Sequence, residues 1–376
     1  MEHSYIEFPT HWIYNNDTII IKPDFNKDIN SLLFCINNNI NSLIFSENND
    51  IDKVIKNLKD NNISCKISKF NRPIYCLPDF LLNLIFGNNF NSSVNNLSET
   101  LLNLTFGYEF NQCVDNLPQS LEKLTFGYNF NQKVDNLPQN LLYLNFGFNF
   151  SKTVNNLPPN LLNLTFDTNF NKHVNNLPSS LLNLTLGNNF NEHVNNLPYG
   201  LLNLTFGNNF NKHVNNLPQG LNLTFGNNFN QLVDNLPSTL LYLTFGSKFN
   251  QLVDNLPHNL KKITFGYYFN QSIDNLPETL EILTIGIKFN QSLDNLPNFI
   301  IEIDFTRMNI YKNYFNNGLN CLPNSVCEIK LPDNYEQEII NLPSNLKKIY
   351  CNKNYKFIDK LKSKKINIEN YINNYY

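Results

Sequence analysis

The sequence predicts a mainly β repeat solenoid, a stack of coils of about 20 residues that form a ladder of strands, with a small α/β cap at the N-terminal end. Two observations predict this class. A Leu-Pro pair recurs along most of the 376-residue chain, and the segments between successive pairs are near copies of one another. Within each copy, a stretch such as Leu204-Thr205-Phe206 alternates apolar and polar side chains, as half-buried strands do. No stretch of the copy has helical spacing, and one coil is too small to fold alone, so the array is expected to fold as a stack.

The Leu-Pro pairs give the period of the repeat. Successive leucines are 20 residues apart, except for one step of 19, from Leu217 to Leu236, and one of 26, from Leu296 to Leu322. The aligned leucines are Leu77, Leu97 (followed by Ser98 in place of proline), Leu117, Leu137, Leu157, Leu177, Leu197, Leu217, Leu236, Leu256, Leu276, Leu296, Leu322 and Leu342.

Each position of the coil has an expected role. Gly207 ends the strand, where we expect a turn with positive φ. Pro198 has no N–H group, so it belongs in the turning part of the coil and not in the strand ladder. The apolar positions expected inside the stack are Leu197, Leu201, Leu204, Phe206, Phe210 and Val214.

Two coils differ in length. The shorter one has lost a residue between Pro218 and Leu223, where Gly220 precedes Leu221. The longer one carries its six extra residues around residues 307–312, before Phe315. Because a one-residue slip within a strand would turn its core side chains outward, we predict that loops absorb both changes and that the strands keep their register.

Phe-Asn pairs also recur along the chain, beginning at Phe90, Phe110, Phe130, Phe170, Phe190, Phe210, Phe229, Phe249, Phe269 and Phe289. With these pairs and the Leu-Pro pairs, the repeat unit resembles the FNIP repeat, which is named for its Phe-Asn and Leu/Ile-Pro pairs. The resemblance extends from about Phe70 to about Cys351, with departures at Ser98, Ser151 and Asp167. It implies a leucine-rich-repeat-like solenoid with a parallel strand ladder, in a family known from social amoebae and giant viruses. Its members are mostly regarded as protein-interaction modules, and some carry an N-terminal F-box that would dock a ubiquitin ligase.

The sequence divides into an α/β cap at residues 1–69, the repeat array at residues 70–351, and a basic C-terminal cap or tail at residues 352–376. In the first segment, strands are predicted at residues 12–14, 18–22 and 32–35, and a helix at residues 50–58, but no F-box helices. In the last segment, Phe357, Ile358 and Leu361 are expected to form the buried side of a capping helix.

Aromatic residues interrupt an otherwise monotonous surface and give the candidate site. The outward strand positions are mostly Asn and Thr, and we expect their amides to form hydrogen bonds from coil to coil. Tyr108, Tyr128 and Phe148 follow three successive glycines, and Lys123 and Tyr143 lie nearby in the repeat. Exposed aromatics beside a lysine are typical of a protein-binding hot spot. The alternative is an aromatic ladder that only stabilises the stack.

Two columns of ionisable residues, one of histidine and one of aspartate, are candidate metal sites. His173, His193 and His213 occupy one position of three successive coils, and since a buried valine follows each, we expect them to point outward without a completing carboxylate or cysteine. The acidic column is expected to form a solvated edge, since a calcium site needs several converging oxygens. It consists of Asp234, Asp254, Asp274 and Asp294.

Function classes are narrowed by what the sequence contains. Neither catalytic nor phosphate-binding motifs occur, so we expect no enzyme activity, no cofactor and no small-molecule substrate. A net charge of −3 does not favour nucleic acid or a membrane. Seven scattered cysteines, and no signal peptide or apolar membrane span, favour a cytoplasmic location, in the host cytoplasm if the protein is viral.

The sequence therefore predicts a non-enzymatic protein–protein interaction scaffold. One alternative is a substrate adaptor whose N-terminal region recruits a ubiquitin ligase while the solenoid binds the target. A self-associating structural protein is another.

Overall fold

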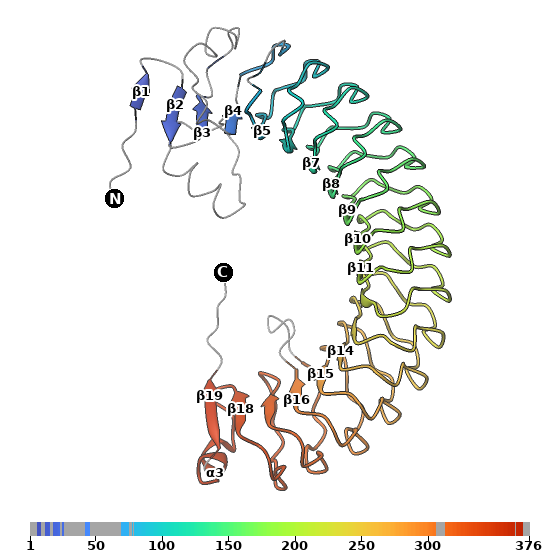
Figure 1. Ribbon diagram of the computed structural model, residues 1–376. Helices are drawn as coiled ribbons and strands as arrows, with labels where there is room; N and C mark the ends of the chain where they lie inside the picture. The colour runs from blue at the N-terminus through green and yellow to red at the C-terminus, as the bar shows by residue number, and fades with distance from the viewer. Residues whose placement is uncertain are drawn as a thin grey trace. The chain divides into compact units, whose positions relative to one another are not determined.

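The structure is a computed structural model that describes residues 6–8, 12–15, 18–22, 25, 42–45, 69–74, 77, 79–305, 313–364 and 366–370. These residues form two compact units, Met1–Gly187 and Asn188–Tyr376. Both consist of short strands joined by irregular segments, and the strands of a unit lie side by side (Figure 1).

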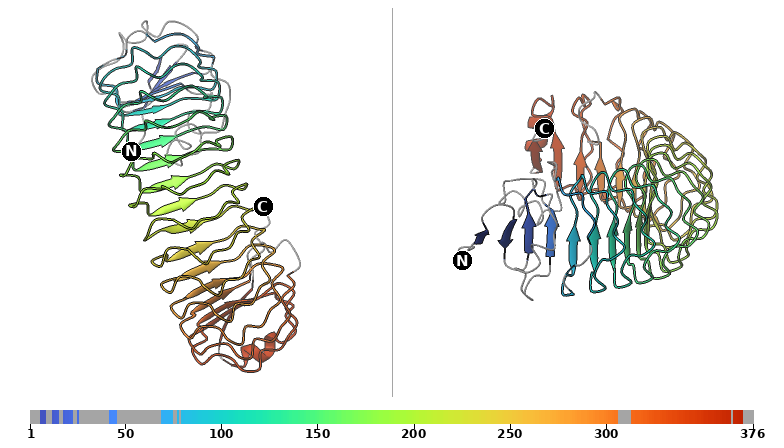
Figure 2. Two further views of the ribbon diagram at one scale, coloured as in Figure 1. Left: turned by 90° about the vertical axis from the view of Figure 1, so that its right-hand side faces the viewer. Right: turned by 90° about the horizontal axis from the view of Figure 1, so that it is seen from above.

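The described residues of the first unit form ten strands in one sheet. Two antiparallel pairings, β1 with β2 and β2 with β3, begin it, and every later pairing in the unit is parallel. Figure 2 draws the strands as arrows, and successive arrows of the repeat coils point in the same direction. The predicted strands at residues 12–14 and 18–22 are confirmed as β2 and β3, whereas the predicted strand at 32–35 and helix at 50–58 lie outside the described residues. The strands are β1 (Ile6–Phe8), β2 (Trp12–Asn15), β3 (Thr18–Ile21), β4 (Ser42–Phe45), β5 (Asn83–Ile85), β6 (Asn103–Thr105), β7 (Lys123–Thr125), β8 (Tyr143–Asn145), β9 (Asn163–Thr165) and β10 (Asn183–Thr185).

The second unit continues the same pattern and adds a short helix. In the predicted capping helix, α3, Leu361 is buried while Phe357 and Ile358 are half-buried, so one of the three predicted residues faces the core. All strand pairings from β11 to β19 are parallel. The elements are β11 (Asn203–Thr205), β12 (Asn222–Thr224), β13 (Tyr242–Thr244), β14 (Lys262–Thr264), β15 (Ile282–Thr284), β16 (Glu302–Asp304), β17 (Glu328–Lys330), β18 (Lys348–Cys351), α3 (Ile358–Lys362) and β19 (Asn367–Asn370).

The core is built from columns of identical side chains. All six apolar positions predicted from the coil at Leu197 are buried. In most coils two phenylalanines stack on one another, with ring centroids 3.6 Å apart for Phe126 and Phe130, and each of these two rings stacks again on its counterpart in the next coil. Leu186 and Ile285 replace the first phenylalanine in two coils. Burial of many rings in register explains why successive coils are near copies, since a changed side chain would lose contacts on both sides.

The asparagine of the Phe-Asn pair has a structural role of its own. The Asn111 N–H group donates to Asn91 Oδ1 at 2.9 Å, and Asn131 N–H donates to Asn111 Oδ1 at the same distance. The second unit repeats this bond, for example from Asn250 N–H to Asn230 Oδ1 at 2.9 Å. The carboxamide thus satisfies a main-chain donor that lies outside the strand ladder. Ser151 interrupts the signature, but its N–H group still donates to Asn131.

The repeat glycines are required for a reason other than the predicted one. Positive φ was expected at Gly207 and its equivalents, but among the described glycines only Gly220 has it, at 72°. The prediction was therefore wrong. A Cβ atom added at Gly127 would lie 1.9 Å from the carbonyl oxygen of Gly107, and one at Gly246 would lie 2.1 Å from that of Gly226. Glycine is favoured because the backbones of successive coils come close together at this position, although Asp167 occupies it in one coil.

The length changes leave the strand register intact, as predicted. Asn203 is paired with Asn222 across the 19-residue step, and Glu302 with Glu328 across the 26-residue step. In the full-length coils, the leucine after the turn donates its N–H group to the carbonyl of the Leu-Pro proline, as Leu201 does to Pro198 at 3.2 Å. Among the described residues, the shortened coil has no equivalent bond at Leu221, and Gly220 takes up the tighter path.

Adding a second leucine beside Leu221 is expected to raise the free energy of unfolding slightly, by about 1 kcal/mol or less, because one turn hydrogen bond is restored. Binding of a protein partner should stay unchanged, since the strands on both sides already have the standard register. Urea unfolding and partner affinity, measured on the same two proteins, test this expectation. Loss of partner binding in the extended protein would show that the short coil is itself a functional feature.

Candidate functional site

The outward strand face carries an asparagine ladder, formed in the first unit by Asn83, Asn103, Asn163 and Asn183. Asn103 Nδ2 donates to Asn83 Oδ1 at 2.6 Å, and Asn183 Nδ2 donates to Asn163 Oδ1 at 2.7 Å. The predicted coil-to-coil hydrogen bonding is thereby confirmed. Each amide already has a partner within the stack, so this face offers an approaching protein few free groups.

Lys123 and Tyr143 interrupt the asparagine ladder. They are partners in the register of β7 and β8, so their Cα atoms are directly opposite on adjacent strands. Both side chains are exposed, and Tyr143 retains 44% of its accessible surface. The structure therefore brings these two predicted site residues together as a tyrosine–lysine pair on the sheet.

Tyr108, Tyr128 and Phe148 form a continuous aromatic ladder at the turn that follows the strands. The ring centroids of Tyr108 and Tyr128 are 4.5 Å apart, and those of Tyr128 and Phe148 are 4.4 Å apart, with nearly parallel planes. Tyr108 is exposed, while the other two rings are half-buried. Desolvation, together with the neighbouring Tyr128 and Glu109, raises the pKa of Tyr108, so its hydroxyl stays protonated at neutral pH.

The five predicted residues thus form two groups. The ladder lies at the turn and the Lys123–Tyr143 pair lies on the strands. Within the described part of the chain, no hydrogen bond, ring contact or cation–π contact joins the two groups. Ring faces inside the ladder are occupied by neighbouring rings, so a partner could reach only ring edges, the hydroxyl groups and the outer faces at the two ends.

The same turn in the second unit carries an aromatic cluster that the sequence reasoning missed. Tyr267 and Tyr268 meet edge to face with centroids 4.7 Å apart, and Lys288 Nζ lies 3.6 Å from the ring centroid of Tyr314. A hydrogen bond with Tyr314 raises the pKa of Lys288. The sequence contains a sign of this cluster, because Tyr267 directly follows the repeat glycine Gly266, just as Tyr108 directly follows Gly107.

Charged side chains occupy the outward strand positions near the C-terminal end of the second unit. Lys330 on β17 forms ion pairs with Glu302, Asp304 and Glu328, the second at 3.1 Å and the third at 3.6 Å. Partial burial lowers the pKa of Lys330, but hydrogen bonds to Glu302 and Asp304 raise it overall, so the lysine stays charged. This network joins β16 to β17 across the longest coil.

The histidine and aspartate columns are exposed at every position predicted for them. Each of three aspartates accepts a hydrogen bond from an asparagine of the next coil, as Asp254 does from Asn275 Nδ2 at 3.1 Å. The acidic column therefore acts as a row of acceptors. The described residues contain no group of three or more His, Cys, Asp or Glu side chains arranged to hold a metal ion.

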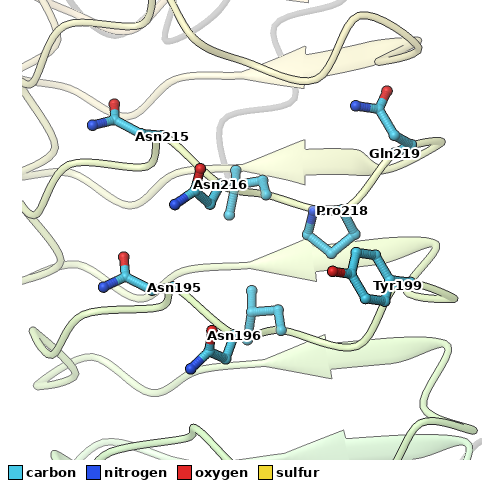
Figure 3. A pocket seen from close by; sticks show the side chains of 9 residues that line it. Asn195, Asn196, Tyr199, Asn215, Asn216, Pro218 and Gln219 are labelled. Carbon is cyan, nitrogen blue, oxygen red and sulfur yellow. The ribbon is translucent and has the colours of Figure 1, made fainter.

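A depression of about 570 Å³ lies over two Leu-Pro loops of the second unit, where the shortened coil begins. Six of its lining residues define what is called the amide pocket below: Asn195, Asn196, Tyr199, Asn215, Asn216 and Gln219. Figure 3 shows the asparagines of successive coils one above the other, with Tyr199 at the opposite end beside Pro218. Tyr199 retains 94% of its accessible surface. The sequence reasoning missed this residue, although a tyrosine after Leu-Pro is unique among the coils.

Comparison with known proteins confirms the repeat type. The FNIP Repeat family model matches residues 93–129, 114–149, 213–248 and 249–288. The chain is similar to CroV588, a circular leucine-rich-repeat protein of a giant virus, with 34% sequence identity and a TM-score of 0.72. The match covers 92% of this chain and 58% of CroV588, so the chain spans less than two thirds of that protein.

A second solved structure with detectable similarity is YopM from Yersinia enterocolitica, with 21% identity and a TM-score of 0.44, over 76% of this chain and 68% of that one. No curated protein matches the chain. The fold is leucine-rich-repeat-like, a class that is commonly used for protein–protein interaction and is typically non-enzymatic. Among the described residues, no helix has the length and apolar character needed to cross a membrane.

Proposed function

We propose that this FNIP repeat-containing chain is a non-enzymatic scaffold that binds a protein partner through Tyr108, Lys123, Tyr128, Tyr143 and Phe148. The observation that carries the proposal is the aromatic ladder. Three rings are collected at one turn of successive coils, and the stack leaves part of their surface accessible to solvent. Aromatic side chains beside a lysine supply the contacts that dominate protein interfaces.

The surrounding surface supports this choice of docking area. Asn163 and Asn183 bond to each other and expose little apolar surface, so they have little to gain from a partner. The tyrosine–lysine pair adds a positive charge to the surface, and the aromatic ladder adds apolar area, both of which the asparagine ladder lacks. The leucine-rich-repeat-like fold adds a general expectation of protein binding, without identifying the partner.

The same proposal assigns a role to each of the three segments of the chain. Residues 1–69 act as an N-terminal cap, residues 70–351 present the binding surface, and residues 352–376 act as a basic C-terminal cap, with the protein in the cytoplasm. Proximity labelling with the full chain, in the cell that makes it, would identify the partner. Recovery of ubiquitin-ligase subunits would instead favour the adaptor role.

Tyr128→Ala and Phe148→Ala are each expected to weaken binding of that partner by about 2 kcal/mol, because each removes an aromatic anchor. The folded state should persist, since neither ring belongs to the fully buried columns. Asn203→Ala is the control: it removes the acceptor of Asn222 Nδ2 and should leave binding unchanged. Affinity and melting temperature should be measured on each variant. A lower melting temperature with unchanged affinity in both aromatic variants would assign the rings to the stack alone.

A further inference from the structure

The amide pocket differs from the equivalent place in three aspartate-bearing coils because its asparagines have no partner among the residues that the structure describes. In three successive coils of the second unit, the second asparagine donates to the aspartate of the coil before it, as Asn255 Nδ2 does to Asp234 Oδ1 at 3.3 Å. In the pocket, both members of each pair are asparagine. Within the described residues, Asn195, Asn196, Asn215 and Asn216 make no hydrogen bond to another side chain or to the backbone, and all four are exposed.

The pocket therefore presents four free carboxamides in two rows, one row from each coil (Figure 3). A carboxamide has two N–H donors and an acceptor oxygen with two lone pairs. None of the lining residues carries a charge. Gln219 also lines the pocket, and its Oε1 accepts from Thr239 Oγ1 at 2.8 Å, which fixes the side chain and leaves its Nε2 donors available.

Tyr199 adds a flat apolar surface beside these amides. With 94% of its surface accessible, its ring faces are open, in contrast to the rings of the aromatic ladder, which cover one another. A ligand that matches this site must be uncharged and must carry several groups that both donate and accept hydrogen bonds. It must also offer a face of C–H groups to the tyrosine ring. A pyranose ring meets all three conditions, because its hydroxyls are donors and acceptors and its axial C–H groups form an apolar face.

We propose that the amide pocket binds a neutral oligosaccharide, with a sugar ring on Tyr199 and its hydroxyls on the carboxamides of Asn195, Asn196, Asn215 and Asn216. The volume of about 570 Å³ is within the roughly 300–1,000 Å³ of ligand pockets and accommodates a short oligosaccharide. An anionic ligand would find no opposite charge here, since the lining residues carry no cation. This site is separate from the proposed protein-docking residues, which all belong to the first unit.

Saturation-transfer NMR and calorimetric titration of the full chain test the proposal. The probes are cellohexaose and chitohexaose, which stand for free polysaccharides, and a mannose-rich glycan released from a glycoprotein, which stands for the second source. Oligogalacturonate is the anionic control. We expect saturable binding of at least one neutral probe and none of oligogalacturonate. Which neutral probe binds identifies the source.

Tyr199→Ala should weaken that binding about tenfold, whereas Tyr199→Phe should retain it, because the ring and not the hydroxyl makes the stacking contact. Tyr242→Ala, which removes another exposed tyrosine outside the pocket, is the matched control and should have no effect. Both alanine changes are at exposed positions, so the melting temperature should stay the same.

Asn195→Asp should also weaken binding about tenfold. By analogy with Asp234 and Asn255, the new carboxylate would accept the amide of Asn216 and withdraw its donors from the ligand. Asp234→Asn, the reverse change one coil beyond the pocket, should leave binding unchanged. Failure of every neutral probe to bind would overturn the proposal. So would binding that survives both Tyr199→Ala and Asn195→Asp, or saturable binding of an asparagine-rich peptide in place of the sugars.

Discussion

Replacing Phe126 by alanine is expected to lower the free energy of unfolding by about 3–5 kcal/mol, the cost of removing a fully buried aromatic ring. Phe126 is 3% exposed, and its ring stacks on Phe130 within its own coil at 3.6 Å. It also stacks on Phe106 at 5.7 Å and on Phe146 at 5.6 Å, in the coils before and after. The cavity left by the substitution is therefore shared by three coils.

Hydrogen exchange should accelerate in all three of those coils, because each coil depends on its neighbours to bury its own rings. Urea unfolding gives the total cost, and exchange followed by mass spectrometry gives its distribution. Tyr143→Ala, at an exposed position of the next coil, should change stability by about 0.5 kcal/mol or less. Loss of protection confined to residues 117–137 would contradict the stacked arrangement.

The fold was predictable because the sequence repeats the same physical requirement in every coil. Leu204 and Phe206 face inward wherever their equivalents occur, so one coil explains the others. The register across the short coil was also predictable, since Leu223 and Phe225 keep their spacing and a slip would expose them. The strand lies one residue earlier than predicted, at Asn203–Thr205, because main-chain pairing with the next coil extends from Asn203 to Thr205.

The candidate site was predictable only in part. Aromatic residues after three successive glycines identify an unusual surface, but the sequence does not give the orientation of the rings. Their face-to-face stacking depends on the spacing between coils, which only the structure supplies. The amide pocket was missed for a similar reason. Asn195 and Asn215 are two of many asparagines, and the depression that their loops form with Tyr199 depends on the three-dimensional arrangement of neighbouring coils.

Positive φ was wrongly predicted for the repeat glycines because one sequence pattern has two possible physical causes. A glycine at the end of a strand indicates either positive φ or the close approach of another backbone, and the pattern of one sequence does not distinguish them. The structure contains both cases within one coil. Gly220 has a φ of 72°, and a Cβ added there would have open space for 4 Å around it beyond its chain neighbours. A Cβ on Gly226, in contrast, would lie 2.1 Å from the carbonyl oxygen of Gly207.

These two glycines give a paired prediction. Gly226→Ala is expected to lower the free energy of unfolding by about 3 kcal/mol or more, because the methyl group overlaps a neighbouring main chain that cannot move without separating the coils. Gly220→Ala should cost about 1–2 kcal/mol, the penalty of a left-handed conformation with a Cβ atom. Asparagine separates the two causes, since it tolerates positive φ: Gly220→Asn should be nearly neutral, and Gly226→Asn at least as harmful as Gly226→Ala. Urea unfolding of the four variants decides the matter. Equal costs at the two positions would mean that the contact between coils at Gly226 is not what selects glycine there.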